Sequence, residues 1–199
     1  MSAAAPVSGF TLWFWRQMAT WSRLLKRDEM AVEYWERIVA ARPRDALALG
    51  ALAHLKAVVG RRPEAVELLR CALAIEPSNP GTWYNLGYLQ QEEQRHDEAI
   101  ASFDRAIALN EKLDMAYYGK ALSLIKTGRL QEAVAPLKKN TELQPMSPFG
   151  FYQLAHVYHR LQQPDRVALT IRRLSGFEPQ VARQLERETG VVVGVQTGP

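Results

Sequence analysis

The feature that most constrains this chain of 199 residues is a pattern of small and apolar residues that repeats every 34 positions. The pattern is clearest between Pro80 and Leu113. Steps of three and four residues separate many of the marked positions, as expected for one face of a helix. A turn signal lies between the two halves, so the stretch predicts two antiparallel helices. Numbered from Pro80, the marked positions 4, 7, 8, 20, 24 and 27 hold Trp83, Leu86, Gly87, Ala99, Phe103 and Ala106.

Steps of the same length in either direction recover related residues without an insertion. The position that Trp83 holds belongs to Leu49 one step earlier and to Trp15 two steps earlier. Asp45 and Asn79 directly precede two of the predicted helices, and both residue types are good N-caps. The pattern therefore predicts five consecutive units at 12–45, 46–79, 80–113, 114–147 and 148–181.

These units resemble the tetratricopeptide repeat (TPR), a helix–turn–helix that cannot bury its apolar face alone and stacks on its neighbours. The resemblance implies an all-α fold, a right-handed TPR solenoid of five helix–turn–helix repeats plus a C-terminal capping helix at 182–190. Residues 1–11 are expected to form a flexible N-terminus. Residues 191–199 are expected to form a flexible tail, the alternative being a strand added to a partner's sheet.

The unit at 114–147 fits the family's pattern less well than the others. Pro136 falls inside its predicted second helix, where we expect a mild kink rather than a break. This unit is therefore expected to be the loosest of the five. The other departures from the family's usual residues are Gln90, Glu111, Lys120 and Asn140.

The sequence contains no motif for catalysis. No phosphate-binding loop, nucleophile elbow or zinc-protease motif occurs, so we predict no enzyme activity and no cofactor. His156 and His159 share one face of a predicted helix, but no third ligand adjoins them. We interpret them as polar groove residues rather than metal ligands. The single cysteine, Cys71, is expected to be a small buried thiol.

Charge and hydropathy favour a cytoplasmic protein. The formal net charge is +4, and in the second half of the chain basic residues alternate with acidic ones. This pattern argues against nucleic-acid binding, which needs a continuous basic surface. No apolar stretch reaches the length of a transmembrane helix. The short apolar run Phe10–Trp15 lacks the basic segment that would precede it in a signal peptide.

In the TPR family the first helix of each repeat lines a concave groove. Tyr84, Tyr118 and Tyr152 recur at the spacing of the repeat and are expected to form a ladder of rings on successive first helices. The alternative is that these tyrosines only fill space between repeats. The basic and amide residues with which some family members clamp a C-terminal carboxylate are not matched here. By family position, the candidate peptide-binding residues are Tyr84, Asn85, Tyr88, Met115, Tyr118, Leu122, Tyr152, Gln153, His156 and Arg160.

The segment Phe10–Leu25 is unusually aromatic and is flanked by basic residues. Three interpretations remain open. The segment can pack as an N-terminal cap, form a surface for a partner or a second copy, or lie as a helix on a membrane. The aromatic residues that the repeat pattern does not explain are Phe10, Trp13, Phe14 and Trp21.

These observations predict a non-enzymatic protein–protein interaction module, an adaptor that binds a peptide or helix of another protein in its concave TPR groove. The alternative is a structural scaffold that forms a homo-oligomer, or docks to a complex, through its Trp-rich N-terminal helix.

Overall fold

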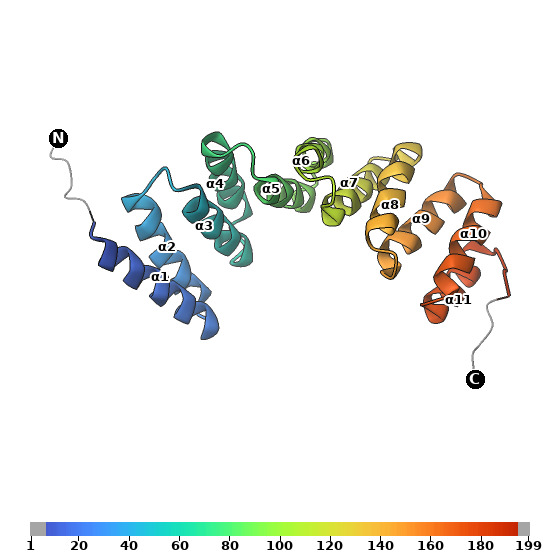
Figure 1. Ribbon diagram of the computed structural model, residues 1–199, viewed down its shortest axis with the longest axis horizontal. Helices are drawn as coiled ribbons and strands as arrows, with labels where there is room; N and C mark the ends of the chain where they lie inside the picture. Colours follow the sequence, from blue (N-terminus) through green and yellow to red (C-terminus); the bar gives the residue numbers. More distant parts are fainter. Residues whose placement is uncertain (1–6, 195–199) are drawn as a thin grey trace. The chain divides into compact units, whose positions relative to one another are not determined.

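The computed structural model describes residues 7–194, which contain eleven α-helices and no strand (Figure 1). The predicted all-α class is confirmed. The chain divides between Gln94 and Arg95 into two compact units, here called unit 1 (residues 1–94) and unit 2 (residues 95–199). This boundary lies between the two helices of the predicted repeat at 80–113. The division of the chain into five repeats remains a prediction.

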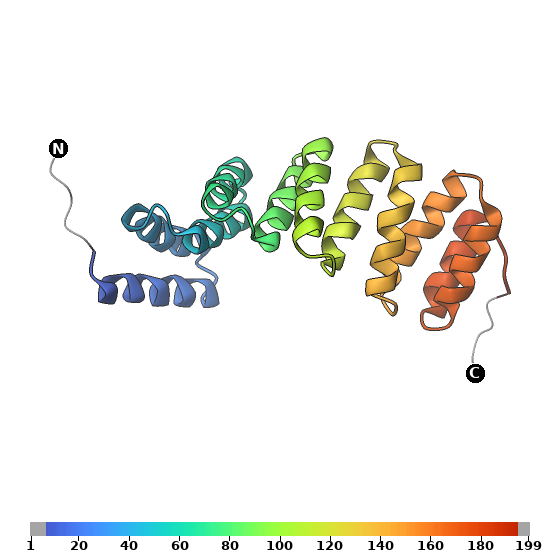
Figure 2. The ribbon, with the colours of Figure 1, turned by 45° about the horizontal axis from the view of Figure 1, so that its top comes forward.

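Unit 1 contains five described helices, each packed against the next in chain order. Figure 2 shows α1 along the outer edge of this unit. Its helices are α1 (Gly9–Leu24), α2 (Asp28–Ala41), α3 (Ala46–Val58), α4 (Arg62–Ile75) and α5 (Pro80–Glu92).

Unit 2 contains six described helices that also pack in chain order, and its last helix contacts both α9 and α10. Its helices are α6 (His96–Leu109), α7 (Asp114–Lys126), α8 (Leu130–Leu143), α9 (Pro148–Arg160), α10 (Pro164–Ser175) and α11 (Pro179–Thr189). The α11 helix occupies most of the segment predicted as a capping helix and begins three positions earlier.

The helices begin where the sequence places its caps. The carboxylate of Asp45 accepts a hydrogen bond of 3.0 Å from the backbone N–H of Ala48, and Asn79 accepts one of 3.1 Å from Thr82. Both predicted N-caps are thereby confirmed. The starts of α3, α5, α7 and α9 follow one another at the spacing of the sequence pattern. In contrast, α1 begins at Gly9, within the segment expected to be flexible, because the hydroxyl of Ser8 caps it.

A left-handed residue ends the first helix of each pair. The five residues stand 34 positions apart, and each has a φ between 55° and 84°. The next N–H donates back to a carbonyl five positions earlier, as from Arg129 to Leu124 at 2.9 Å. This is the Schellman geometry, in which glycine is favoured because it has no Cβ. The five residues are Lys26, Gly60, Gln94, Gly128 and Gln162.

Packing within each unit depends on alanine and glycine at the helix contacts. In unit 1, Ala31, Ala53 and Ala65 are fully buried. In unit 2, the ring of Phe103 on α6 lies against the backbone of Gly119 on α7, where a Cβ would come within 2.5 Å of it. Small residues at these positions bring helices close enough to bury the larger side chains.

A charged residue, Lys56, is buried in unit 1. Its ammonium on α3 pairs with Glu36 on α2 at 2.7 Å and also with Glu64 on α4. Burial works against its charge, but the hydrogen bonds to the two carboxylates outweigh that effect and raise the pKa of Lys56. This side chain therefore links three successive helices electrostatically.

The structure differs from the sequence-based expectations at two places. Cys71 is exposed on α4 rather than buried, because it lies on the face opposite to Leu69. In the C-terminal segment, Val191 and Val193 pack against the core of unit 2, and the carboxylate of Glu186 accepts a 2.6 Å hydrogen bond from the N–H of Val193. Residues 195–199 of the expected tail, and residues 1–6, lie outside the described residues.

Pro136 leaves α8 unbroken from Leu130 to Leu143, as the sequence predicts. The proline ring is buried.

Candidate protein-interaction surfaces

Unit 1 has a channel that follows the first helices of its pairs. Three adjoining clefts, of about 590, 260 and 280 Å³, make up this channel. They adjoin one another, since Ala51, His54 and Asn85 each line two of them. The floor along α3 consists mostly of small residues, namely Gly50, Ala51, Ala53 and Ala57.

The walls of the channel bring together residues from several helices. Asn85 and Tyr88 on α5 and His54 on α3 line the 260 Å³ cleft together. The guanidinium of Arg62 lies 3.6 Å from the carboxylate of Glu92 among the residues that line this cleft. Two of the predicted peptide-binding residues thus line one cavity. The sequence pattern did not predict the ion pair that joins α4 to α5.

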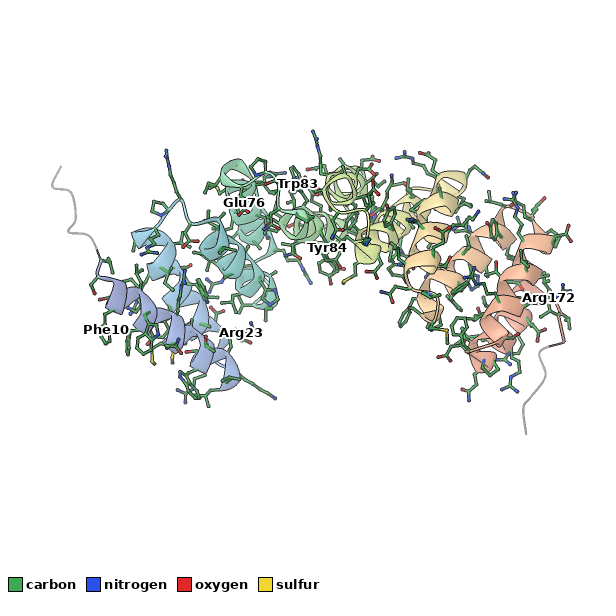
Figure 3. The ribbon with its side chains drawn as sticks, in the orientation of Figure 1. Phe10, Arg23, Glu76, Trp83, Tyr84 and Arg172 are labelled. Atoms are coloured by element: carbon green, nitrogen blue, oxygen red, sulfur yellow. The ribbon has the colours of Figure 1, made fainter. Side chains whose placement is uncertain are left out.

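Tyr84 does not line the channel, although its neighbour Asn85 does. Figure 3 shows Trp83 and Tyr84 on different sides of α5. The indole N–H of Trp83 donates a 2.8 Å hydrogen bond to the carbonyl of Pro77, which anchors the start of the helix. The repeat pattern predicts Trp83 as a packing residue, and this contact agrees with a structural role.

In unit 2, two predicted residues meet across neighbouring first helices. The hydroxyl of Tyr118 on α7 lies close enough to the side chain of Gln153 on α9 to influence its pKa. Burial raises the pKa of the Tyr118 hydroxyl, and the contact with Gln153 only partly opposes that effect. Both side chains are half-buried. Their contact joins the faces of α7 and α9 that the TPR resemblance assigned to the groove.

Further along α9, a carboxylate from α11 draws together two more predicted residues. Glu188 accepts a 2.9 Å hydrogen bond from the hydroxyl of Tyr152 and lies 2.9 Å from Nε2 of His156. Gln184 donates a third hydrogen bond of 2.8 Å to this carboxylate. The sequence pattern did not predict this cluster, which joins α9 to α11.

The cluster places a negatively charged carboxylate beside α9 at this end of unit 2. The hydrogen bond from Gln184, followed by those from Tyr152 and His156, lowers the pKa of the Glu188 carboxyl despite its partial burial. Burial, together with the adjacent carboxylate, raises the pKa of Tyr152. An ionised carboxylate of the chain itself therefore accompanies His156.

The remaining predicted residues lie on the surface of unit 2 without a shared cavity among the described clefts. Met115 and Arg160 are exposed, and Leu122 is half-buried. The tyrosine ladder also remains a prediction, because Tyr84 belongs to unit 1 and the other two rings to unit 2.

The N-terminal aromatic residues are exposed. Phe10 stacks on Trp13 with ring centroids 5.8 Å apart, and both project from α1. Trp15 packs into the core of unit 1 instead. Exposure rules out, for the described residues, the interpretation in which Phe10, Trp13, Phe14 and Trp21 pack inward as a cap.

Two classes of site are not formed by residues 7–194. No group of three His, Cys, Asp or Glu side chains in this range has the geometry to hold a metal ion. Within the same range, every helix is too short or too polar to cross a membrane.

The helix pairs, their regular spacing and the channel along the first helices define a class of helical repeat protein that binds other proteins. The sequence pattern of the family described as tetratricopeptide repeat matches residues 80–113. The chain thus contains a tetratricopeptide repeat at residues 80–113, and its fold is that of tetratricopeptide repeat proteins.

Known proteins resemble this chain in sequence and in fold. Protein FlbA of Caulobacter vibrioides is 27% identical over 111 residues, which cover 56% of this chain and 19% of that protein. The chain spans less than a fifth of the length of the curated relatives it matches.

Two solved structures have a similar fold. MamA has a TM-score of 0.75 at 19% identity and covers 87% of this chain and 96% of its own. YrrB, described as a TPR protein with an unusual peptide-binding site, has a TM-score of 0.74 at 19% identity, covering 87% of this chain and 90% of its own. These likenesses show the TPR fold, which is typically that of a non-enzymatic interaction scaffold.

Proposed function

We propose that this chain is an adaptor that binds a helical segment of a partner protein in the channel of unit 1. The succession of three adjoining clefts along α1, α3 and α5 carries this proposal. Helix axes approach to about 8–10 Å when the side chains at their contact are small. The floor at Gly50, Ala51 and Ala57 offers such a contact to an incoming helix.

The walls of the channel supply apolar surface that a ligand can cover and polar groups that can orient it. Tyr88 and Trp35 present aromatic surface to the channel, and Leu24 adds an aliphatic wall. Asn85 and His54 place hydrogen-bonding groups among them. A channel that is mostly apolar with a few polar groups is typical of recognition sites. The solved YrrB structure has the same fold and a described peptide-binding site, which supports the assignment of this class of ligand.

A steric block tests the proposal. A Cβ at Gly50 would meet nothing within 4 Å, so the Gly50→Leu variant should fold while its side chain fills the channel. A photo-crosslinking amino acid at His54 should capture a partner in the native host. The same amino acid at Glu67, which is exposed on α4 and does not line the channel, is the matched control.

We expect crosslinks from position 54 that Gly50→Leu removes and Gly50→Ala largely retains. Equal capture from positions 54 and 67, or capture that survives Gly50→Leu in a folded chain, would contradict binding in the channel. Circular dichroism of each variant establishes that the helices are intact.

A further inference from the structure

The α1 helix of unit 1 has two apolar faces, of which only one is packed. Leu12 and Ala19 are buried in unit 1, together with Ser22. The opposite face carries a row of large apolar side chains, here called the α1 stripe. Its residues and exposed fractions are Phe10 73%, Trp13 55%, Phe14 44%, Trp21 58%, Leu24 68% and Leu25 63%.

The stripe is continuous along the helix. At about 3.6 residues per turn, its six members fall within an arc of about 120°. Only Gln17 interrupts this arc between Phe14 and Trp21. Figure 3 shows Phe10 near the start of α1 and Arg23 near its end. Of the six stripe residues, only Leu24 also lines the channel of unit 1. A partner bound in the channel therefore leaves most of the stripe uncovered.

The charges beside the stripe all have one sign. The chain has no aspartate or glutamate before Asp28, whereas Arg16, Arg23, Lys26 and Arg27 are basic. Asp45 lies 3.4 Å from Arg16. In the described part of the chain, the other three basic residues have no carboxylate within ion-pair distance and are exposed.

The four acidic residues of α2, namely Asp28, Glu29, Glu33 and Glu36, form no ion pair with the described side chains of Arg23, Lys26 or Arg27. On α2, Glu29 pairs with Arg61 at 2.8 Å, and Glu36 pairs with Lys56 at 2.7 Å. Both carboxylates are thus engaged with α3 and with the loop before α4. The α1 stripe consequently combines aromatic and aliphatic side chains with a basic border at its C-terminal end, formed by Lys26 and Arg27.

We propose that the α1 stripe binds the surface of an anionic lipid bilayer, with α1 lying in the plane of the interface. Tryptophan and phenylalanine favour the boundary between lipid headgroups and acyl chains. Each nearby Arg or Lys adds attraction to anionic headgroups, a factor of about five in affinity. A single exposed helix at the edge of the fold also suits a flat surface.

Charge favours a bilayer over a second copy of the chain. A symmetric dimer through the stripe would bring together two segments that both carry a net positive charge. Like charges that are directly opposed disfavour association. An anionic headgroup layer supplies the negative charge that the segment before Asp28 lacks.

Co-sedimentation of the full chain with vesicles tests the proposal. One set of vesicles contains phosphatidylcholine alone, and the other an equal mixture of phosphatidylcholine and phosphatidylglycerol. The stripe variant is Phe10→Ser/Trp13→Ser/Trp21→Ser, and the charge variant is Lys26→Glu/Arg27→Glu, whose two residues do not line the channel. The matched control, Met146→Ser/Phe149→Ser/Leu169→Ser, removes three similarly exposed apolar side chains from unit 2.

We expect the wild-type chain to bind the anionic vesicles at least about tenfold more tightly than the neutral ones. The stripe variant should lose at least about tenfold in affinity for the anionic vesicles, since three large apolar side chains no longer insert. The charge variant should lose the preference for anionic lipid, and the unit 2 control should bind like the wild type.

Three results would overturn the proposal. The first is that the wild-type chain does not bind anionic vesicles at low salt. The second is that the unit 2 control loses as much binding as the stripe variant. The third is that light scattering shows a dimer of the wild type and a monomer of the stripe variant, while neither protein binds vesicles. Circular dichroism confirms folding of every variant. Channel variants such as Gly50→Leu should leave vesicle binding unchanged, which separates this test from that of the adaptor function.

Discussion

The side-chain amide of Asn140 on α8 donates a hydrogen bond of 3.1 Å to the main-chain carbonyl of Asp114, the first residue of α7. Asn140 is buried, at a position where the TPR pattern usually has an apolar residue. Its other amide atom, Oδ1, points at Gly150 on α9, where a Cβ would lie only 2.2 Å away. One polar side chain therefore fixes the distances among three helices of unit 2.

This contact predicts coupled effects of substitution at positions 140 and 150. Gly150→Ala should lower the free energy of unfolding by about 1–3 kcal/mol, because the new methyl group displaces Asn140. Asn140→Ala should cost about 1 kcal/mol for the lost hydrogen bond. The double variant should cost clearly less than the sum, since the clash is then absent. Urea titrations of the four proteins measure this cycle, and strict additivity would show that the two residues do not interact.

Gly119 supports the same unit in a different way. Gly119→Ala should destabilise the chain by about 1–3 kcal/mol, because its Cβ would press on the buried ring of Phe103. Gly50→Ala is the matched control, since it is also helical and has no neighbour within 4 Å of the added Cβ. That control should stabilise the chain by about 0.5–1 kcal/mol. Urea unfolding curves that shift in the same direction for both variants would contradict this account.

The left-handed turn residues predict opposite effects of glycine and alanine. Gln162 has a φ of 56°, so Gln162→Gly should raise the free energy of unfolding by about 0.5–1 kcal/mol. Gly128 has a φ of 78°, and Gly128→Ala should lower it by about 1 kcal/mol. Chemical denaturation tests both changes. A Gln162→Gly variant less stable than the wild type would show that the glutamine makes a contact worth more than its backbone strain.

The carboxylate of Glu188 predicts a contribution to stability that depends on pH. Its pKa in the folded chain is lowered from 4.5, chiefly by the hydrogen bond from Gln184. The contribution is therefore fully present above the unfolded-state pKa and disappears as the pH falls through the folded-state value. The difference in melting temperature between wild type and Glu188→Gln should shrink between pH 7 and pH 3. A difference that stays constant over this range would mean that the charge of Glu188 does not stabilise unit 2.

Much of the fold follows from local sequence signals. Helical spacing and N-caps such as Asp45 and Asn79 are read within a few positions of each helix start, and the structure confirms them. The repeat period also places the turn positions. The repeat period does not reveal that Lys26, Gln94 and Gln162 adopt the same left-handed conformation as Gly60 and Gly128. The tertiary packing of each helix pair overrides the backbone preference of the residue at the turn.

The candidate surfaces were predictable only in part. Of the residues named by family position, Asn85 and Tyr88 line a cavity of unit 1, and their role in peptide binding remains a prediction. Family positions missed Glu188, since its contacts with Tyr152 and His156 join helices that are distant in the sequence. Long polar side chains reach across helices in directions that a periodic pattern does not record. The same reason explains why the pairing of Lys56 with Glu36 and Glu64 was not foreseen.

The position of Cys71 gives the protein a single chemical handle. It is the sole cysteine in the sequence, it is exposed on α4, and it does not line the channel of unit 1. A maleimide dye should therefore attach once per chain, in unit 1 only, without any engineered substitution. The native protein can thus report ligand and vesicle binding by fluorescence from one defined site.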